Sequence, residues 1–225
     1  MESIGFPHWE ALTPATQKAY ETLSQVKFIS RYYLAGGTGL ALHLGHRISV
    51  DLDLFSDHAN TLNPTERYAL RTLLEDPSLE IIYDKEATFS ANWRGVGVSF
   101  FRLEQYPLIK PTSLHKRIPV ASVEEIGAMK LAAIIDRGTR KDLIDLYYIL
   151  QQCDLETLFT IASLKYARVS TFAISAVRAL AYFEDAEALP MPIMIDKTPW
   201  GKMKNFLRQK ALDAGRKQLT NLWKV

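Results

Sequence analysis

Residues 34–55 hold two groups of side chains that could do chemistry together. The stretch reads LAGGTGLALHLGHRISVDLDLF. Residues 36–39 form a glycine-rich turn, and two carboxylates, Asp51 and Asp53, stand close to the end. Glycines let a phosphate approach the backbone closely, and free amides at a helix start can donate to its oxygens. The turn therefore suggests phosphate binding.

The spacing of the two carboxylates suits a shared cation. Asp51 and Asp53 are two positions apart, so on a strand they point the same way. Neighbouring carboxylates repel each other unless a cation lies between them, and Mg²⁺ commonly uses one or two carboxylates plus substrate phosphates. Turn and strand together favour phosphoryl or nucleotidyl transfer, with a triphosphate (NTP) at the glycines and Mg²⁺ or Mn²⁺ at the aspartates. The alternative is a tight turn followed by an ordinary solvated strand.

A dinucleotide-binding fingerprint is incomplete here. Gly37 and Gly39 match its first two glycines, but Leu42 stands where the third belongs, and Asp53 follows Gly37 by only 16 residues. The segments that follow favour antiparallel strands rather than further strand–helix–strand units. The incomplete fingerprint and the elements that follow it therefore argue against a Rossmann dinucleotide-binding fold.

Hydrophobic periodicity indicates which elements position these groups. Before residue 116 we expect helices at 8–29, from Leu40 to near Gly45, and at 63–74, with strands at 32–35, 48–55, 79–84, 87–93 and 96–103. On the strand at 48–55, Ile48, Val50, Leu52 and Leu54 should share one face. A connector with three prolines follows. From Ser122, which has capping-box spacing to Glu125, we expect only helices, at 122–137, 140–152, 154–165, 170–188 and 200–222.

These elements predict an α+β protein with two parts. Residues 1–115 form an α/β core, and residues 116–225 form an all-helical domain. The chain has 225 residues, 48% of them apolar and 23% charged, which is ordinary for a globular protein. A single cysteine, an N-terminus without a signal-like pattern and no membrane-length apolar run lead us to expect a cytoplasmic protein without a membrane partner.

Positive charge gathers at the C-terminal end. Residues 196–225 contain eight Lys or Arg and two Asp, within a chain of net charge +2. A basic segment on a mildly acidic body can attract a polyanion such as RNA. The alternative is a solvated helix face.

Two blocks of this sequence resemble the AbiEii/AbiGii-toxin-like nucleotidyltransferases of the DNA polymerase β-like superfamily. The first is the opening stretch, which is similar to the order G-G-T-x-L-x-L-x-x-G-x-R-x-S-x-D-x-D. The second, residues 129–146, reads MKLAAIIDRGTRKDLIDL and is similar to K-L-x-A-x-x-x-R-x-x-x-[RK]-D-x-x-D-L. The resemblance spans residues 32 to about 150.

The resemblance implies a polymerase β-like nucleotidyltransferase core with a mixed sheet, followed by helices. It implies a bacterial toxin that transfers nucleotides, in some members to RNA including tRNA, with a cognate antitoxin as partner. The site residues it implies fall into phosphate or nucleotide ligands, metal ligands and later members of the site. They are Gly36, Gly37 and Thr38 for phosphates, Asp51 and Asp53 for Mg²⁺, Lys130 for nucleotide phosphates, and Asp142 with Asp145 as late acidic residues.

Other candidates rest on residue type and position. Arg47 and Ser49 are candidate nucleotide ligands, with pairing to Asp51 or Asp53 as the alternative for Arg47. Lys130 and Arg137 are seven apart on one helix face, and a break at Gly138 could bring them beside Asp142. A structural salt-bridge cluster is the other interpretation of that group.

The third carboxylate of polymerase β-like enzymes has no obvious counterpart. The expected strand, GVGVSFFRLEQ, presents Ser99 and no acid until Glu104. Either Glu104 or Asp142 takes the role, or the site uses one ion. The remaining alternatives for the protein are a non-catalytic nucleotide- or RNA-binding module and a small-molecule nucleotidyltransferase.

Overall fold

The computed structural model describes residues 6–73 and 77–222. The chain divides into two compact units, Met1–Ser122 and Val123–Val225. The first combines a sheet with helices and the second is helical, so the expected α+β class is confirmed. Among the described residues, no helix is long and apolar enough to cross a membrane.

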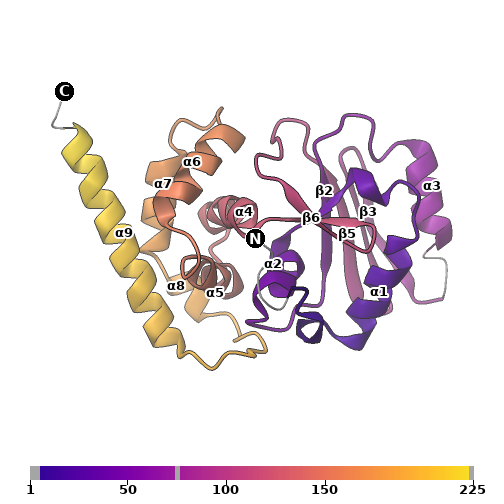
Figure 1. Ribbon diagram of the computed structural model, residues 1–225, viewed down its shortest axis with the longest axis horizontal. Coiled ribbons are helices and arrows are strands. Elements are labelled where there is room, and N and C mark those ends of the chain that lie inside the picture. Colours follow the sequence, from indigo (N-terminus) through magenta and orange to yellow (C-terminus); the bar gives the residue numbers. More distant parts are fainter. Residues whose placement is uncertain (1–5, 74–76, 223–225) are drawn as a thin grey trace. The chain divides into compact units, whose positions relative to one another are not determined.

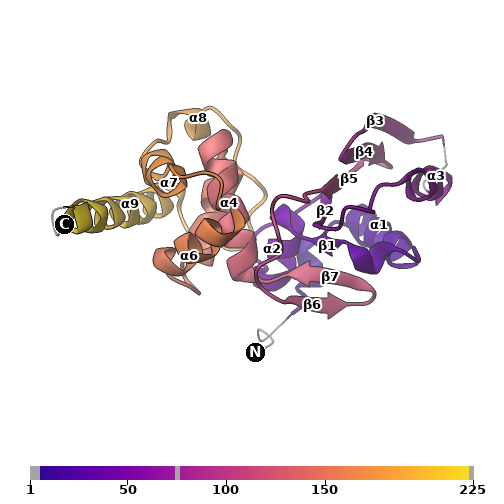
Figure 2. The same cartoon turned by 90° about the horizontal axis from the view of Figure 1, so that it is seen from above.

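The first unit is built on one seven-stranded mixed sheet (Figures 1 and 2). The strands lie in the order β3-β4-β5-β2-β1-β7-β6. Their bounds are β1 (Tyr33–Leu34), β2 (Leu52–Ser56), β3 (Leu79–Lys85), β4 (Thr88–Trp93), β5 (Val96–Arg102), β6 (Thr112–His115) and β7 (Ile118–Ala121). β2 runs parallel to β5 and antiparallel to β1, so the strand that carries Asp53 is central.

Three helices accompany the sheet: α1 (Pro14–Ser24), α2 (Gly36–Leu44) and α3 (Pro64–Leu73). α1 starts cleanly, because the Thr13 side chain accepts a hydrogen bond from the Thr16 amide and Pro14 occupies the first turn. Short 3-10 helices at Trp9–Ala11 and Ile29–Arg31 flank α1. The single helix expected at 8–29 is therefore divided into shorter elements.

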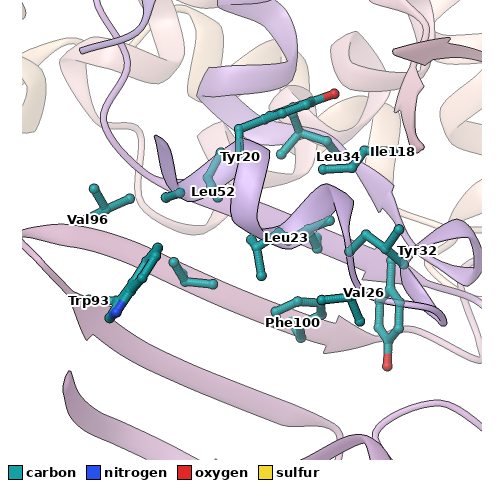
Figure 3. Packing of buried hydrophobic residues seen from close by; sticks show 14 of the residues in the cluster. Tyr20, Leu23, Val26, Tyr32, Leu34, Leu52, Trp93, Val96, Phe100 and Ile118 are labelled. Carbon is teal, nitrogen blue, oxygen red and sulfur yellow. The ribbon is translucent and has the colours of Figure 1, made fainter. Parts of the chain in front are cut away.

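The core of this unit lies between α1 and one face of the sheet (Figure 3). Tyr20 and Leu23 of α1 are buried together with Leu52 of β2 and Phe100 of β5. Burial alternates along β2, with Leu52, Leu54 and Ser56 buried. Asp53 is therefore directed to the opposite face of the sheet.

The second unit consists of helices around α4. Their bounds are α4 (Val123–Asp136), α5 (Arg140–Ile149), α6 (Leu155–Lys165), α7 (Phe172–Leu180), α8 (Glu184–Glu187) and α9 (Trp200–Leu222). α4 packs against α5, α6 and α7, and α9 packs against α5 and α7 (Figure 1). A fully buried ion pair, Lys165 Nζ to Glu125 Oε1 at 2.7 Å, joins α6 to α4. The predicted helix at 170–188 is two helices, α7 and α8.

Two features differ from the expectation for the first unit. Residues 112–121, expected as a connector, form the hairpin β6–β7, which completes one edge of the sheet and lies before the division at Ser122. The strand expected from Ile48 begins only at Leu52. Its expected alternation fails there, because Val50 is 44% exposed whereas Ser49 is buried.

Candidate functional site

The glycine-rich turn is the first turn of helix α2. Gly36 begins the helix with a φ of +62°, a left-handed conformation that favours glycine. Ala35, at the N-cap, provides no side-chain hydrogen bond to the first-turn amides. The hydrogen-bond donors at the start of α2 are therefore backbone amides. They lie on the side of the sheet to which Asp53 is directed.

The two carboxylates fit against glycines on either side of β2. A Cβ at Gly36 would lie 2.7 Å from Asp53 Oδ2, and a Cβ at Gly97 would lie 2.6 Å from Asp51 Oδ1. Since β2 lies between β1 and β5, Asp53 leans toward the start of α2 and Asp51 leans toward β5. A larger residue at either glycine would force the neighbouring carboxylate to shift. Mutual repulsion between the two carboxylates favours this splayed arrangement.

The hydroxyls of Thr38 and Ser49 secure the strand that carries the aspartates. Thr38 Oγ1 donates to the Asp51 carbonyl and lies 2.9 Å from Ser49 Oγ, and both side chains are buried. The Ala35 amide donates to the Asp53 carbonyl at 3.1 Å. These side chains, predicted as nucleotide ligands, thus engage the backbone next to the metal-ligand candidates.

Arg47 lies buried behind the glycine turn. A Cβ at Gly37 would come within 2.5 Å of Arg47 Nη2, and Arg47 Nη1 donates to the Ile48 carbonyl at 3.1 Å. Arg47 as a whole is only 4% exposed. It places a fixed positive charge beside the first turn of α2, where an anion would be bound.

The position beside Asp53 on the next strand is occupied by Ser99. The parallel register of β2 and β5 pairs these two residues, and Ser90 of β4 lies opposite Ser99. Their hydroxyl oxygens are 3.0 Å apart. Glu104 lies five residues further along the chain, where it pairs with Arg102 Nε at 2.8 Å. At about 3.3 Å per strand residue, the structure does not bring Glu104 to the aspartate pair.

The donor set is therefore small. Within residues 6–73 and 77–222, no group of three or more His, Cys, Asp or Glu side chains gathers as a metal site. Two carboxylates with glycine-made space around them still fit one hard divalent cation whose other ligands are phosphate oxygens and water. The sequence had already indicated that the expected strand carries no third acidic residue.

Gly97 and Ser90 are site neighbours that the sequence analysis missed. Gly97 lies inside β5, where a glycine weakens a strand and often marks a close approach of another group. The glycine within GVGVSFF carried that signal. It can be interpreted only when β5 is known to pair with β2. Ser90 carried no signal of its own.

The second sequence block forms a cluster at the corner between α4 and α5. The Lys130 ammonium contacts Asp142 Oδ1 at 2.8 Å and Asp145 Oδ2 at 2.6 Å. Asp142 Oδ2 also accepts hydrogen bonds from Arg137 Nε at 2.9 Å and from Thr139 Oγ1 at 2.5 Å. The structure thus brings all four predicted residues of this block together within the second unit.

This cluster is buried except for one member. Both carboxylates are fully buried and the Lys130 side chain is 6% exposed, but the Arg137 side chain is 53% exposed. Burial on its own would raise the pKa of Asp142, but the adjacent Lys130 ammonium and the hydrogen bonds accepted by the carboxylate lower it to about 2. Asp142 is therefore ionised at neutral pH and is fully engaged in this corner.

A helix start that faces one carboxylate on a central strand of a mixed sheet, with a second carboxylate just before that strand, fits a nucleotidyltransferase. Comparison with known protein families agrees. The family described as nucleotidyl transferase AbiEii toxin, type IV toxin–antitoxin system, matches residues 19–112 and 104–221. The chain belongs to this family and is a nucleotidyltransferase. The resemblance of the two sequence blocks is confirmed, and the match extends beyond residue 150 through most of α9.

Individual proteins are also similar to this chain, in sequence or in fold. An uncharacterised protein of Aquifex aeolicus is 28% identical over 200 residues, which cover 86% of this chain and 93% of that protein. The fold is similar to MenT4, a nucleotidyltransferase toxin of Mycobacterium tuberculosis, with a TM-score of 0.57, 16% identity and coverage of 90% and 86% of the two chains. It is also similar to JHP933 of Helicobacter pylori, with a TM-score of 0.55, 15% identity and coverage of 95% and 97%.

Proposed function

We propose that this chain transfers a nucleoside monophosphate from an NTP to a hydroxyl group of RNA, using a divalent cation held by Asp51 and Asp53. The observation that carries the proposal is the pair of carboxylates fitted against glycines, with one of them leaning toward the start of α2. Phosphate ligands and cation ligands thereby meet at one place. A cation bound there would neutralise charge on the phosphate oxygens.

The chain's own groups have distinct tasks in this proposal. The backbone at Gly36 and Gly37 offers amides to the triphosphate, and the buried Arg47 adds positive charge behind it. Thr38 and Ser49 hold the backbone of Asp51 in place. The acceptor oxygen forms a bond to the α-phosphorus while the bond to the β-phosphate oxygen breaks, releasing pyrophosphate and the hydroxyl proton. Such a reaction depends mainly on positioning and charge stabilisation.

The corner cluster has a supporting task. Lys130 and Asp142 were expected to contact phosphates and to complete the acidic set. Because Lys130 is held by two buried carboxylates, we propose that the cluster fixes the α4–α5 corner and presents the exposed part of Arg137 to an anionic ligand.

The acceptor is proposed from charge. Along α9, Lys202 and Arg208 are exposed, and Arg208 and Lys210 lie over the rings of Phe183 and Phe206 at 5.4 and 5.3 Å. Basic side chains along one helix suit single-stranded RNA, whose phosphates they can contact. A tRNA end has this chemistry. NTPs and tRNA are cytoplasmic, and the family implies a cognate antitoxin, so we place the reaction in the cytoplasm of a bacterium that also makes the antitoxin.

The test is transfer of label from each of the four α-labelled NTPs to total tRNA, with Mg²⁺ present. We expect labelled RNA and released pyrophosphate with the wild-type chain. Asp51→Asn and Asp53→Asn should each lower the rate on the order of 100-fold or more, because several kcal/mol of charge stabilisation depend on these ligands.

Matched variants separate the site from general damage. Asp136→Asn removes an exposed carboxylate of α4 and should retain full activity. Glu104→Gln should retain most activity, since Glu104 is remote from the aspartates in register. Label on a small-molecule acceptor but not on RNA would contradict the RNA proposal. NTP binding without pyrophosphate release from any acceptor would contradict the transfer reaction itself.

A further inference from the structure

Three aromatic side chains form a row on the face of the sheet to which Asp53 is directed. Tyr33 of β1, Phe55 of β2 and Phe101 of β5 lie side by side in the strand register. The ring centroids are 5.9 Å apart between Tyr33 and Phe55 and 5.1 Å apart between Phe55 and Phe101, and both pairs are stacked. Phe55 follows Asp53 by two positions on β2, so both side chains point to the same face.

This aromatic row keeps part of its surface open. Tyr33 is buried, but Phe55 and Phe101 are only partly buried. The rings on the other face of the sheet differ, because Phe89 and Phe100 are fully buried in the core. Core packing therefore accounts for Phe89 and Phe100, whereas Phe55 and Phe101 retain apolar ring surface that a ligand can cover.

The aromatic row and the glycine turn lie on opposite sides of Asp53. β1 runs antiparallel to β2, and the Ala35 amide donates to the Asp53 carbonyl at 3.1 Å. From there the chain turns toward the residues before β2, since a Cβ at Gly37 would lie 3.1 Å from Ser49 Oγ. Phe55 lies in the other direction, toward the end of β2. At about 3.3 Å per strand residue, it is about 6.6 Å beyond Asp53.

This order decides which substrate meets the aromatic row. In phosphoryl transfer the attacking oxygen and the leaving group lie roughly in line, on opposite sides of the phosphorus. With the β- and γ-phosphates at the glycine turn and the α-phosphate at Asp53, the acceptor hydroxyl approaches from the side of Phe55. One ribose separates the 3′ hydroxyl of an RNA from its terminal base, which brings that base to Phe55 and Phe101.

We propose that Phe55 and Phe101 bind the terminal base of the acceptor RNA by stacking, with Tyr33 supporting Phe55 from the buried end of the row. The inference rests on the proposed function, because it takes the glycine turn for the leaving pyrophosphate and Asp53 for the cation. Stacking on aromatic side chains is a common way to bind unpaired bases, and it tolerates all four of them. The stack positions the 3′ hydroxyl for attack on the α-phosphorus.

The test compares two acceptors that differ only in one base: an RNA oligonucleotide with an intact 3′ nucleotide, and the same RNA with an abasic 3′ nucleotide. With the wild-type chain, loss of the base should raise the KM for the acceptor about tenfold, as expected for one stacked base, and leave the KM for NTP unchanged. Phe101→Leu keeps an apolar side chain but removes the ring. It should raise the KM for the intact RNA by a similar factor and make the two acceptors equivalent.

The matched control is Tyr68→Leu, which removes an exposed ring of α3 in the same unit. It should keep the full wild-type dependence on the terminal base. A purely structural role of Phe101 would weaken the use of both acceptors alike and would leave the ratio between them unchanged. Fluorescence anisotropy without NTP measures the same combinations as equilibrium binding.

Three results would overturn the proposal. One is equal use of the two acceptors by the wild-type chain. Another is a folded Phe101→Leu chain, checked by thermal unfolding, that still loses about tenfold when the base is removed; Phe55→Leu gives this result if Phe101→Leu does not fold. The third is a rise in the KM for NTP alone, which would assign the row to the base of the NTP. Labelled RNA forms in all three cases, so the proposed function stands. Absence of label on RNA with the wild-type chain would overturn the proposed function, and this inference with it.

Discussion

At the scale of single residues, the site is defined as much by missing side chains as by present ones. Gly36 and Gly97 leave the space that the carboxylates of Asp53 and Asp51 fill, and Gly37 leaves space for Arg47. The first glycine also adopts a left-handed conformation. Charge, hydrogen-bond donors and space are therefore specified by different residues.

Gly36→Ala should lower both stability and activity. The left-handed conformation alone costs a non-glycine residue about 1–2 kcal/mol. The new Cβ would also displace the Asp53 carboxylate from its place 2.7 Å away. Urea unfolding should show a loss of about 1–2 kcal/mol, and NMP transfer should fall with it.

The control for this change is Gly201→Ala in α9, where nothing lies within 4 Å of the added Cβ. Alanine is favoured over glycine in a helix by up to about 1 kcal/mol, so this variant should be as stable as the wild type or more so. Equal effects at both positions would show that Gly36 has no special role.

At the scale of elements, the sequence predicts most helices and strands within a few residues, because apolar segments alternate along the chain with polar, glycine- or proline-containing breaks. The hairpin β6–β7 was missed for a physical reason. Pro119 occupies β7, and a proline within a run argues against a strand because it cannot donate to the ladder. Here β7 meets β1 in register only at Val120, which leaves the proline at a tolerated place.

The candidate site could likewise be predicted from the sequence only in part. The order of residues from Gly36 to Asp53 predicted the two groups that the structure brings together, since consecutive elements carry them. Neighbours from β5 and β4 could not be predicted, because strand order and register depend on long-range packing. The burial of Lys130 and Asp142 likewise depends on how α4 and α5 pack, which spacing along a helix does not report.

Asp142→Asn tests the corner between α4 and α5. The folded pKa of Asp142, about 2, lies below its ordinary value of 3.8. The carboxylate therefore stabilises the fold fully above about pH 4, and this stabilisation is lost as pH falls through 2. The shift corresponds to about 2–3 kcal/mol. Asp142→Asn should lose about that amount at pH 7 and show a flatter stability profile between pH 5 and 2.

Denaturant unfolding at a series of pH values measures both effects. Asp136→Asn, at an exposed position of the neighbouring helix, should follow the wild-type profile. Parallel profiles for Asp142→Asn and the wild type would mean that the cluster contributes nothing to acid stability.

At the scale of the whole molecule, charge is divided between an acidic body and a basic C-terminal segment. Residues 196–225 carry eight Lys or Arg and two Asp, although the chain as a whole is only +2. Lys202, Arg208 and Lys210 belong to this segment and approach no carboxylate closely enough for an ion pair among the residues described. An extended polyanion gains most from such a distribution.

Reversing these charges should weaken RNA binding. We expect Lys202→Glu/Arg208→Glu/Lys210→Glu to bind a single-stranded RNA oligonucleotide at least about tenfold more weakly than the wild type. The slope of log affinity against log salt should become shallower by about 2, as three phosphate contacts on a single strand imply. Fluorescence anisotropy at several salt concentrations measures both quantities.

The matched control reverses three exposed lysines of the first unit, Lys18, Lys27 and Lys85. It changes the net charge equally and should retain most of the wild-type salt slope. If both triple variants behave alike, RNA responds to net charge only and α9 is not the binding surface.

The glycines around the carboxylates also have a genetic consequence. Every missense change in a glycine codon adds a Cβ, and at positions 36, 37 and 97 that atom would come within 2.7 Å of a charged group. A toxin gene is disarmed by any substitution that spoils its active site. Cells that escape from its expression should therefore carry changes in these three glycine codons about as readily as in the codons of Asp51 and Asp53. The spectrum of escape mutations would then include the spaces in the proposed active site as well as its proposed ligands.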